Sequence, residues 1–201
     1  MPEAELDLLD RLVLARDRRF RRRHAIREFS DDPRCIFRLL TTKMQRTTRL
    51  SDGTVLRVGE PVGALHLASE RMPLLRARGG DLAWGKQVAA NLVHSLRLLA
   101  ALAAEDASPL SPRAFGNDFV LPHRSRAFHV IERIGFDVLE PRHPSGPRDR
   151  AVHRAVCLWT ALLRRAHNPL SVRGLRPRDF QSRPVWITRR TLLARYRSTP
   201  A

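Results

Sequence analysis

The sequence predicts one α+β domain, with a small mixed or antiparallel sheet, two long helices and an arginine-rich N-terminal helix. The chain has 201 residues, of which 43% are hydrophobic, and this is enough to bury one core. Helical and strand-like segments follow one another in blocks, without the regular alternation of a parallel α/β fold. Residues 1–33 are expected to form the basic helical segment, and residues 34–201 the α+β domain.

The N-terminal helix is predicted over residues 3–28, where leucines recur at helical spacing. Acidic residues lie in its early turns and arginines in its last turns, an order that stabilises the helix dipole. Six arginines fall between residues 16 and 23, which is more than the dipole explains. Asp32 precedes a proline and is therefore expected to lie outside the helix.

Extended structure is predicted next, because residues 35–50 are rich in β-branched and apolar side chains. A Ser-Asp-Gly turn at 51–53 predicts a hairpin, since glycine accepts the positive φ of a tight reversal. A second strand is expected at 54–57 and a third at 62–67. Ser69-Glu70 then opens a short helical turn.

The second half of the chain mixes helices with strands. Gly135 ends one predicted helix as a C-cap residue. The helix over 82–104 is apolar but interrupted by polar residues, so we expect a core helix rather than a membrane span. The expected helices span 82–104, 124–134, 148–167 and 188–196, and the expected strands span 114–121, 136–140 and 185–187.

Charge narrows the choice of partners. Basic residues outnumber acidic ones by 37 to 20, giving a net charge of +17, and all but two of the basic residues are arginine. A GC-rich genome explains the preference for arginine over lysine but not the excess over acids. That excess predicts a polyanionic partner or an anionic membrane surface.

Compartment is predicted from cysteine use. Cys35 and Cys157 lie far apart in the chain, without a disulfide or metal-binding spacing, so both are expected to be buried thiols in a reducing environment. The first residues are acidic, unlike a secretory signal. We expect a cytoplasmic protein, with attachment to the inner face of the membrane as an open alternative.

Three blocks of sequence carry a family resemblance. The stretch LSDGTVLRVGEPVGALHL at 50–67 is similar to the opening of the YkoP-like domain, and IGFDV at 134–138 and WITRRTL at 186–192 are similar to its later blocks. The resemblance covers about residues 35–197. It implies a bacterial protein of cell-envelope polysaccharide metabolism, associated with polysaccharide deacetylases, and it implies no defined chemical activity. Ala68-Ser69 departs from the family pattern, which has an asparagine near Glu70.

Two groups of residues are candidates for a ligand groove. His66 closes a predicted strand and Glu70 opens a helical turn, so they could act as a catalytic base and its orienting partner. The alternative is a hydrogen-bonded histidine beside a capping glutamate. His123, Arg124 and Arg126 lie at a predicted helix start, where free amides favour an anion. The groove is expected between segments 51–67 and 122–135, with an anionic or sugar-containing ligand.

Several enzyme classes lack their motifs here. A NodB-type deacetylase needs a metal-binding His-x-x-x-His pair, which the sequence lacks, and no zinc spacing of Cys and His occurs. We therefore expect no metal and no cofactor. An acyltransferase related to the GNAT enzymes stays an alternative, because the helix, Ile-Gly-Phe and strand at 127–138 are similar to the end of that fold, and Arg76-Ala77-Arg78-Gly79-Gly80-Asp81 partly matches its cofactor loop. Its final aspartate would repel a phosphate.

The arginine cluster of the first helix is the candidate polyanion or membrane surface. Nucleic-acid binding is an alternative, but aromatic residues are only 6% of the chain and no RNA-binding motif occurs. An anionic membrane or the envelope polysaccharide machinery is the favoured partner, and a simply solvated helix face stays open. The cluster consists of Arg18, Arg19, Arg21, Arg22 and Arg23.

Overall fold

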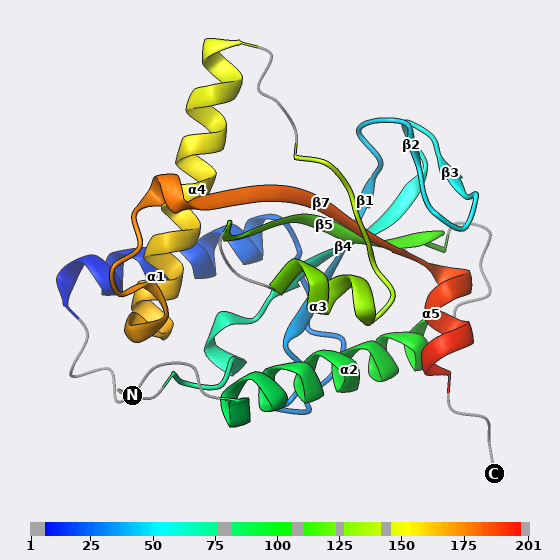
Figure 1. Ribbon diagram of the computed structural model, residues 1–201, viewed down its shortest axis with the longest axis horizontal. Helices are drawn as coiled ribbons and strands as arrows, with labels where there is room; N and C mark the ends of the chain where they lie inside the picture. The colour runs from blue at the N-terminus through cyan, green and yellow to red at the C-terminus, as the bar shows by residue number, and fades with distance from the viewer. Residues whose placement is uncertain (1–6, 76–81, 106–110, 124–126, 142–145, 198–201) are drawn as a thin grey trace.

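The predicted α+β class is confirmed (Figure 1). The computed structural model describes residues 7–75, 82–105, 111–123, 127–141 and 146–197. Its main sheet is mixed, with strand order β1-β4-β5-β7-β6, and a second, two-stranded sheet pairs β2 with β3. The strands are β1 (Phe37–Lys43), β2 (Thr48–Arg49), β3 (Val55–Leu56), β4 (Pro61–Leu67), β5 (Ala114–Pro122), β6 (Asp137–Val138) and β7 (Phe180–Thr188).

Pairing within the main sheet is antiparallel except between β4 and β5, which run parallel. The helices are α1 (Leu8–Arg23), α2 (Leu82–Glu105), α3 (Ala127–Arg133), α4 (Pro147–His167) and α5 (Arg189–Tyr196). Short 3₁₀ turns complete the described elements: η2 (Ser69–Arg71), η3 (Pro169–Val172) and η4 (Pro177–Asp179).

Alternation along the strands assigns the two faces of the sheet. Phe119 and Leu121 of β5 belong to the main core together with residues of α2, α3 and α5. Val120, between them in sequence, points the other way and packs with Cys157 of α4. Helices α2, α3 and α5 therefore cover one face, while α4 covers part of the other.

The β2–β3 hairpin covers another part of that second face. Leu50 and Leu56 of the hairpin region are buried against Val62, Ala114 and Trp186 of the main sheet. Helix α1 packs against α4 beside this face (Figure 1). The second face is thus covered at its two ends, by the hairpin and by α4.

Several expected boundaries were wrong. Helix α1 begins only after Asp7, whose side chain accepts a hydrogen bond from the Asp10 amide at 2.8 Å and caps the helix. Strand β7 begins at Phe180, before the expected strand at 185–187, because residues 180–184 are ordered by pairing with β5 rather than by their local sequence. The predicted strand 136–140 shortens to β6, and residues 124–126 of a predicted helix lie outside the described residues.

Among the described residues, α2 is the one helix long and apolar enough to cross a membrane. In the fold, its residues Leu92, Leu96 and Leu99 are buried in the main core. The expected core role of this helix is therefore seen in the packing of its inner face.

Candidate ligand-binding cavity

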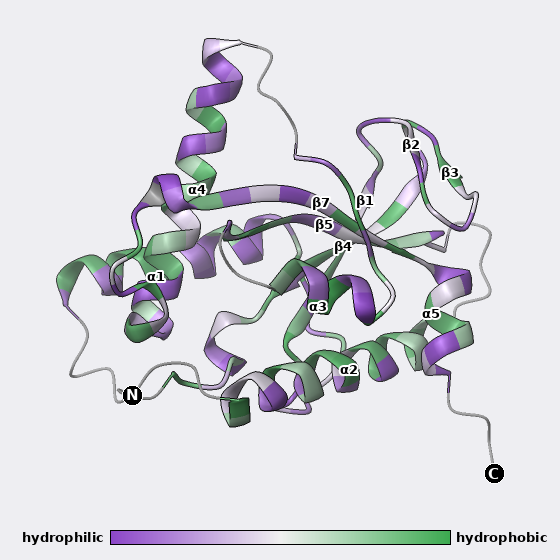
Figure 2. Cartoon of the chain, viewed as in Figure 1, coloured by the Kyte–Doolittle hydropathy of each residue, from purple (hydrophilic) through white to green (hydrophobic). Residues whose placement is uncertain are grey.

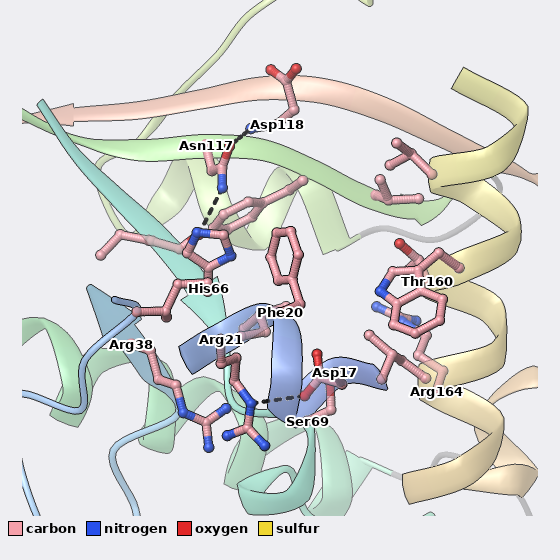
Figure 3. A pocket seen from close by; sticks show the side chains of 18 of the residues that line it. Asp17, Phe20, Arg21, Arg38, His66, Ser69, Asn117, Asp118, Thr160 and Arg164 are labelled. Carbon is pink, nitrogen blue, oxygen red and sulfur yellow. Dashed lines mark hydrogen bonds and ion pairs between the residues drawn. The ribbon is translucent and has the colours of Figure 1, made fainter. Parts of the chain in front are cut away.

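A cavity of about 690 Å³ lies on the second face of the sheet, between α1, strands β4 and β5, and α4 (Figure 3). This volume is typical of sites for small molecules. Its apolar wall comes largely from α4, where Val152, Val156, Trp159 and Leu163 recur at helical spacing, and Phe20 of α1 faces them. The cavity can therefore bury the apolar part of a ligand.

A network of ion pairs forms the polar end of the cavity. Arg38 of β1 is 3% exposed, and its guanidinium donates to Glu28 at 3.0 Å and to Glu70. Arg21 of α1 lies 3.6 Å from Glu70 and 2.9 Å from Asp17. Burial alone would raise the pKa of Glu70, but hydrogen bonds from Arg38 and the charges of both arginines bring it below its usual value. These arginines are compensated within the protein.

His66 lies opposite Arg38 in the β1–β4 register and lines the same cavity. Burial, together with the charge of Arg38, lowers the pKa of His66, so its imidazole is neutral at neutral pH. Its Nε2 atom is buried, and no group in the described part of the chain forms a hydrogen bond with it. A neutral imidazole nitrogen is thus left without its partner at the cavity.

Two further arginines line the cavity, and neither has an acidic partner in the part of the chain that the structure describes. Arg164 of α4 is half-buried, and no carboxylate of the described residues lies within 4 Å of its guanidinium. The Arg164 guanidinium carbon lies over the Phe180 ring, 5.9 Å from its centroid, and burial lowers the pKa of Arg164. Arg16 lies over the Trp159 ring at 5.9 Å and likewise has no ion pair among these residues. Figure 3 shows Arg164 on the side of the cavity opposite His66 and Arg38.

The structure brings His66 and Glu70 to one cavity but does not join them as base and orienting partner. The Glu70 carboxylate is bound by Arg38 and Arg21 instead. Glu70 also makes no helix cap, because the turn that contains it has no side-chain cap bond. The catalytic role of His66 and Glu70 stays a prediction, and in this structure the Glu70 carboxylate is paired with Arg38 and Arg21 rather than with His66.

Of the predicted anion site at the helix start, the structure describes only His123, which does not line the cavity. His123 is exposed and its Nδ1 lies 2.7 Å from the carbonyl oxygen of Asp179, while its partners Arg124 and Arg126 lie outside the described residues. The described residues of segment 122–135 do not line the cavity, and α1 and α4 supply walls that were expected from this segment. The candidate acyltransferase loop at 76–81 also lies outside the described residues.

The arginine cluster of α1 divides between two locations. Arg18, Arg19, Arg22 and Arg23 are exposed on the helix surface, as a polyanion or membrane surface requires. Arg21 is half-buried in the cavity and engaged by Asp17 and Glu70, because it lies on the inward side of the helix. It therefore does not belong with the other four.

The described residues contain neither a cluster of metal ligands nor an activated thiol at Cys157. No group of three or more His, Cys, Asp or Glu side chains there could hold a metal ion. Cys157 lies 3.6 Å from the Nε2 of His153, but burial raises the pKa of its thiol, which disfavours the nucleophilic thiolate. Cys35 is buried and free, as is Cys157.

The blocks that carry the family resemblance meet at the far end of the sheet from α4. The Asp52 carboxylate accepts a hydrogen bond from the Thr188 hydroxyl at 2.8 Å and pairs with Arg190 at 3.1 Å. Asp137 accepts from the Ser51 amide at 3.1 Å. We call these five residues the turn cluster. Its contacts hold the hairpin on the sheet and form no part of the cavity.

Comparison with protein-family models, with curated proteins and with solved structures finds no match for this chain. The resemblance to the YkoP-like family therefore stays a prediction. Reasoning from the sequence missed Arg16, Trp159 and Arg164 as site residues. The apolar spacing of α4 was visible in the sequence, but one arginine among many gave no signal that it would face a cavity.

Proposed function

We propose that this chain is a binding protein for a small amphiphilic anion, a phosphate or carboxylate attached to an apolar body. One observation carries the proposal: Arg164 is half-buried beside an apolar wall, and no described carboxylate compensates its charge. Removing a cation from water without a counter-charge is unfavourable. A bound anion would supply that counter-charge.

Each part of the ligand would have a matching surface. The guanidinium of Arg164 offers paired donors suited to a phosphate or carboxylate. Trp159 and Val156 on the same helix would cover the apolar body. The unpartnered Nε2 of His66 would accept or donate one hydrogen bond, for example with a ligand hydroxyl.

The YkoP-like resemblance adds a ligand class. It places the ligand among the anionic or sugar-containing compounds of bacterial envelope polysaccharide metabolism. An aromatic ring such as Trp159 offers an apolar face that suits either a hydrocarbon or the apolar face of a sugar ring. The physical argument from Arg164 does not depend on this assignment.

The test compares octyl phosphate with octanol, which shares the apolar chain but lacks the charge. Calorimetric titration should show octyl phosphate binding at least tenfold more tightly than octanol. Arg164→Met should remove most of that difference while leaving octanol binding unchanged, because hydrogen bonds to charged groups contribute about 1.5–3 kcal/mol. Arg154→Met is the matched control, since Arg154 is exposed on the same helix and does not line the cavity.

The proposal is overturned if the two probes bind equally, or if neither binds to a protein shown to be folded. It is also overturned if Arg154→Met weakens octyl phosphate as much as Arg164→Met does, because the effect would then come from overall charge.

A further inference from the structure

Helix α1 presents an outward face that the cavity does not use. Asp10 and Val13 are buried and fix the inward side of the helix, so residues half a turn away point to solvent. Leu8 and Leu12 on the opposite side are 74% and 59% exposed. The outward face of α1 consists of Leu8, Arg11, Leu12, Ala15, Arg18, Arg19, Arg22 and Arg23.

This face is divided along its length. Its first two turns carry the exposed Leu8 and Leu12 together with one arginine, Arg11, whereas its last two turns are basic and largely purple in Figure 2. No carboxylate among the described residues pairs with Arg18, Arg19, Arg22 or Arg23. The helix dipole accounts for basic residues in the last turn, but it gives no reason for two exposed leucines in the first two turns.

We propose that the outward face of α1 docks the protein on an anionic lipid bilayer. The leucines would enter the boundary between headgroups and acyl chains, and the arginines would contact lipid phosphates, as in helices that lie in the plane of a membrane surface. The net charge of +17 would draw the whole chain toward such a surface.

The two exposed leucines of the face, Leu8 and Leu12, favour a membrane over a nucleic acid as its partner. Phosphates of DNA or RNA would engage the arginines and leave Leu8 and Leu12 in water. A bilayer would contact the leucines and the arginines at the same time. The face is also separate from the ligand cavity, since none of its residues lines that cavity, so failure of one proposal leaves the other standing.

The experiment is co-sedimentation of the full chain with vesicles at physiological salt. Vesicles of phosphatidylglycerol and phosphatidylcholine in a 30:70 mixture supply negative charge, and pure phosphatidylcholine vesicles are the neutral arm. We expect binding to the anionic vesicles at least twentyfold tighter than to the neutral ones. A duplex DNA of 20 base pairs, titrated separately, is the nucleic-acid arm.

Two variants divide the contributions. Changing Arg18, Arg19, Arg22 and Arg23 together to Gln should weaken binding to anionic vesicles at least thirtyfold, whereas Leu8→Ser with Leu12→Ser should weaken it about tenfold. The matched control changes four exposed arginines elsewhere to Gln, with the same loss of charge and less than a fivefold effect. These are Arg46, Arg49, Arg57 and Arg97.

Circular dichroism must show that each variant is folded, and every altered side chain is exposed. Equal binding to neutral and anionic vesicles overturns the proposal, as does a control variant that weakens binding as much as the α1 variant. DNA binding that depends on the arginines but not the leucines, with no vesicle binding, would assign the face to nucleic acid instead.

Discussion

The turn cluster and the ligand-binding cavity lie on the same face of the sheet, but they differ in how many of their polar side-chain groups have hydrogen-bond or ion-pair partners. At the turn cluster, Asp52 is engaged by the Thr54 amide, the Thr188 hydroxyl and the Arg190 guanidinium. At the cavity, Arg164 has no acidic partner and the Nε2 of His66 has no hydrogen bond among the described residues.

This difference separates residues that hold the fold from residues available to a ligand. A polar group with all its bonds made inside the protein has little left to offer a ligand, while a buried group without them gains by binding one. The motif around Asp52 is easily recognised in the sequence, and in the structure its carboxylate is fully engaged by partners within the protein. Arg164 is one of many arginines in the sequence, and in the structure its guanidinium lines the cavity with no acidic partner among the described residues.

The largest expected effect breaks the sheet beside the turn cluster. A Cβ atom at Gly116 of β5 would lie 1.9 Å from the Val185 carbonyl oxygen and 2.8 Å from the Trp186 Cα of β7. Both are backbone atoms, so the strands must separate, and Gly116→Ala should lower the free energy of unfolding by about 3 kcal/mol. Urea denaturation measures this change.

Gly85→Ala is the control for that substitution. Gly85 lies in α2, and a Cβ there meets nothing within 4 Å, so alanine should stabilise the helix by up to about 1 kcal/mol. If both variants lose the same stability, the close approach of β5 and β7 is not what limits residue 116.

The second effect concerns the turn cluster itself. Burial alone would raise the pKa of Asp52, but the Thr54 amide, the Thr188 hydroxyl and the charge of Arg190 lower it to about 2. This stabilisation is complete above about pH 4, where the carboxyl is ionised even in the unfolded chain, and is lost as the pH falls toward 2. Asp52→Asn should therefore cost about 2 kcal/mol at pH 7.

The pH dependence supplies the control. The stability difference between wild type and Asp52→Asn should narrow steadily between pH 4 and pH 2 in chemical denaturation. Asp31→Asn, at an exposed aspartate, should change stability little. A gap for Asp52→Asn that persists at pH 2 would show that the carboxylate charge is not the stabilising group.

The order of elements was largely predictable from the sequence because it depends on local signals. Gly53 adopts a φ of +82° and Gly135 a φ of +98°, as the turn and C-cap interpretations require. Thr188 caps α5 by accepting a hydrogen bond from the Thr191 amide. Each of these signals lies within a few residues of the structure it fixes.

The cavity was predicted only in part, because its walls come from distant segments. His66 and Glu70 were expected at one pocket and both line it. Arg38 is 28 positions before His66 in the sequence, and only the β1–β4 register makes it the neighbour that takes Glu70. Helices α1 and α4 close the cavity through tertiary packing, which no local pattern encodes.

The smallest expected change in the free energy of unfolding is that of Arg164→Met, and it is the most direct test of the difference between the cavity and the turn cluster. Arg164→Met removes a half-buried charge that has no acidic partner among the described residues, and a methionine of similar length fills the same apolar surroundings. Stability should stay within about 0.5 kcal/mol or rise, since replacing an uncompensated buried charge by an apolar side chain is neutral or stabilising. Thermal and urea denaturation measure it beside octyl phosphate binding, which the same substitution should weaken. If Arg164→Met lowers the free energy of unfolding by 2 kcal/mol or more, Arg164 stabilises the fold as Asp52 does. The proposed difference between the cavity and the turn cluster would then be wrong.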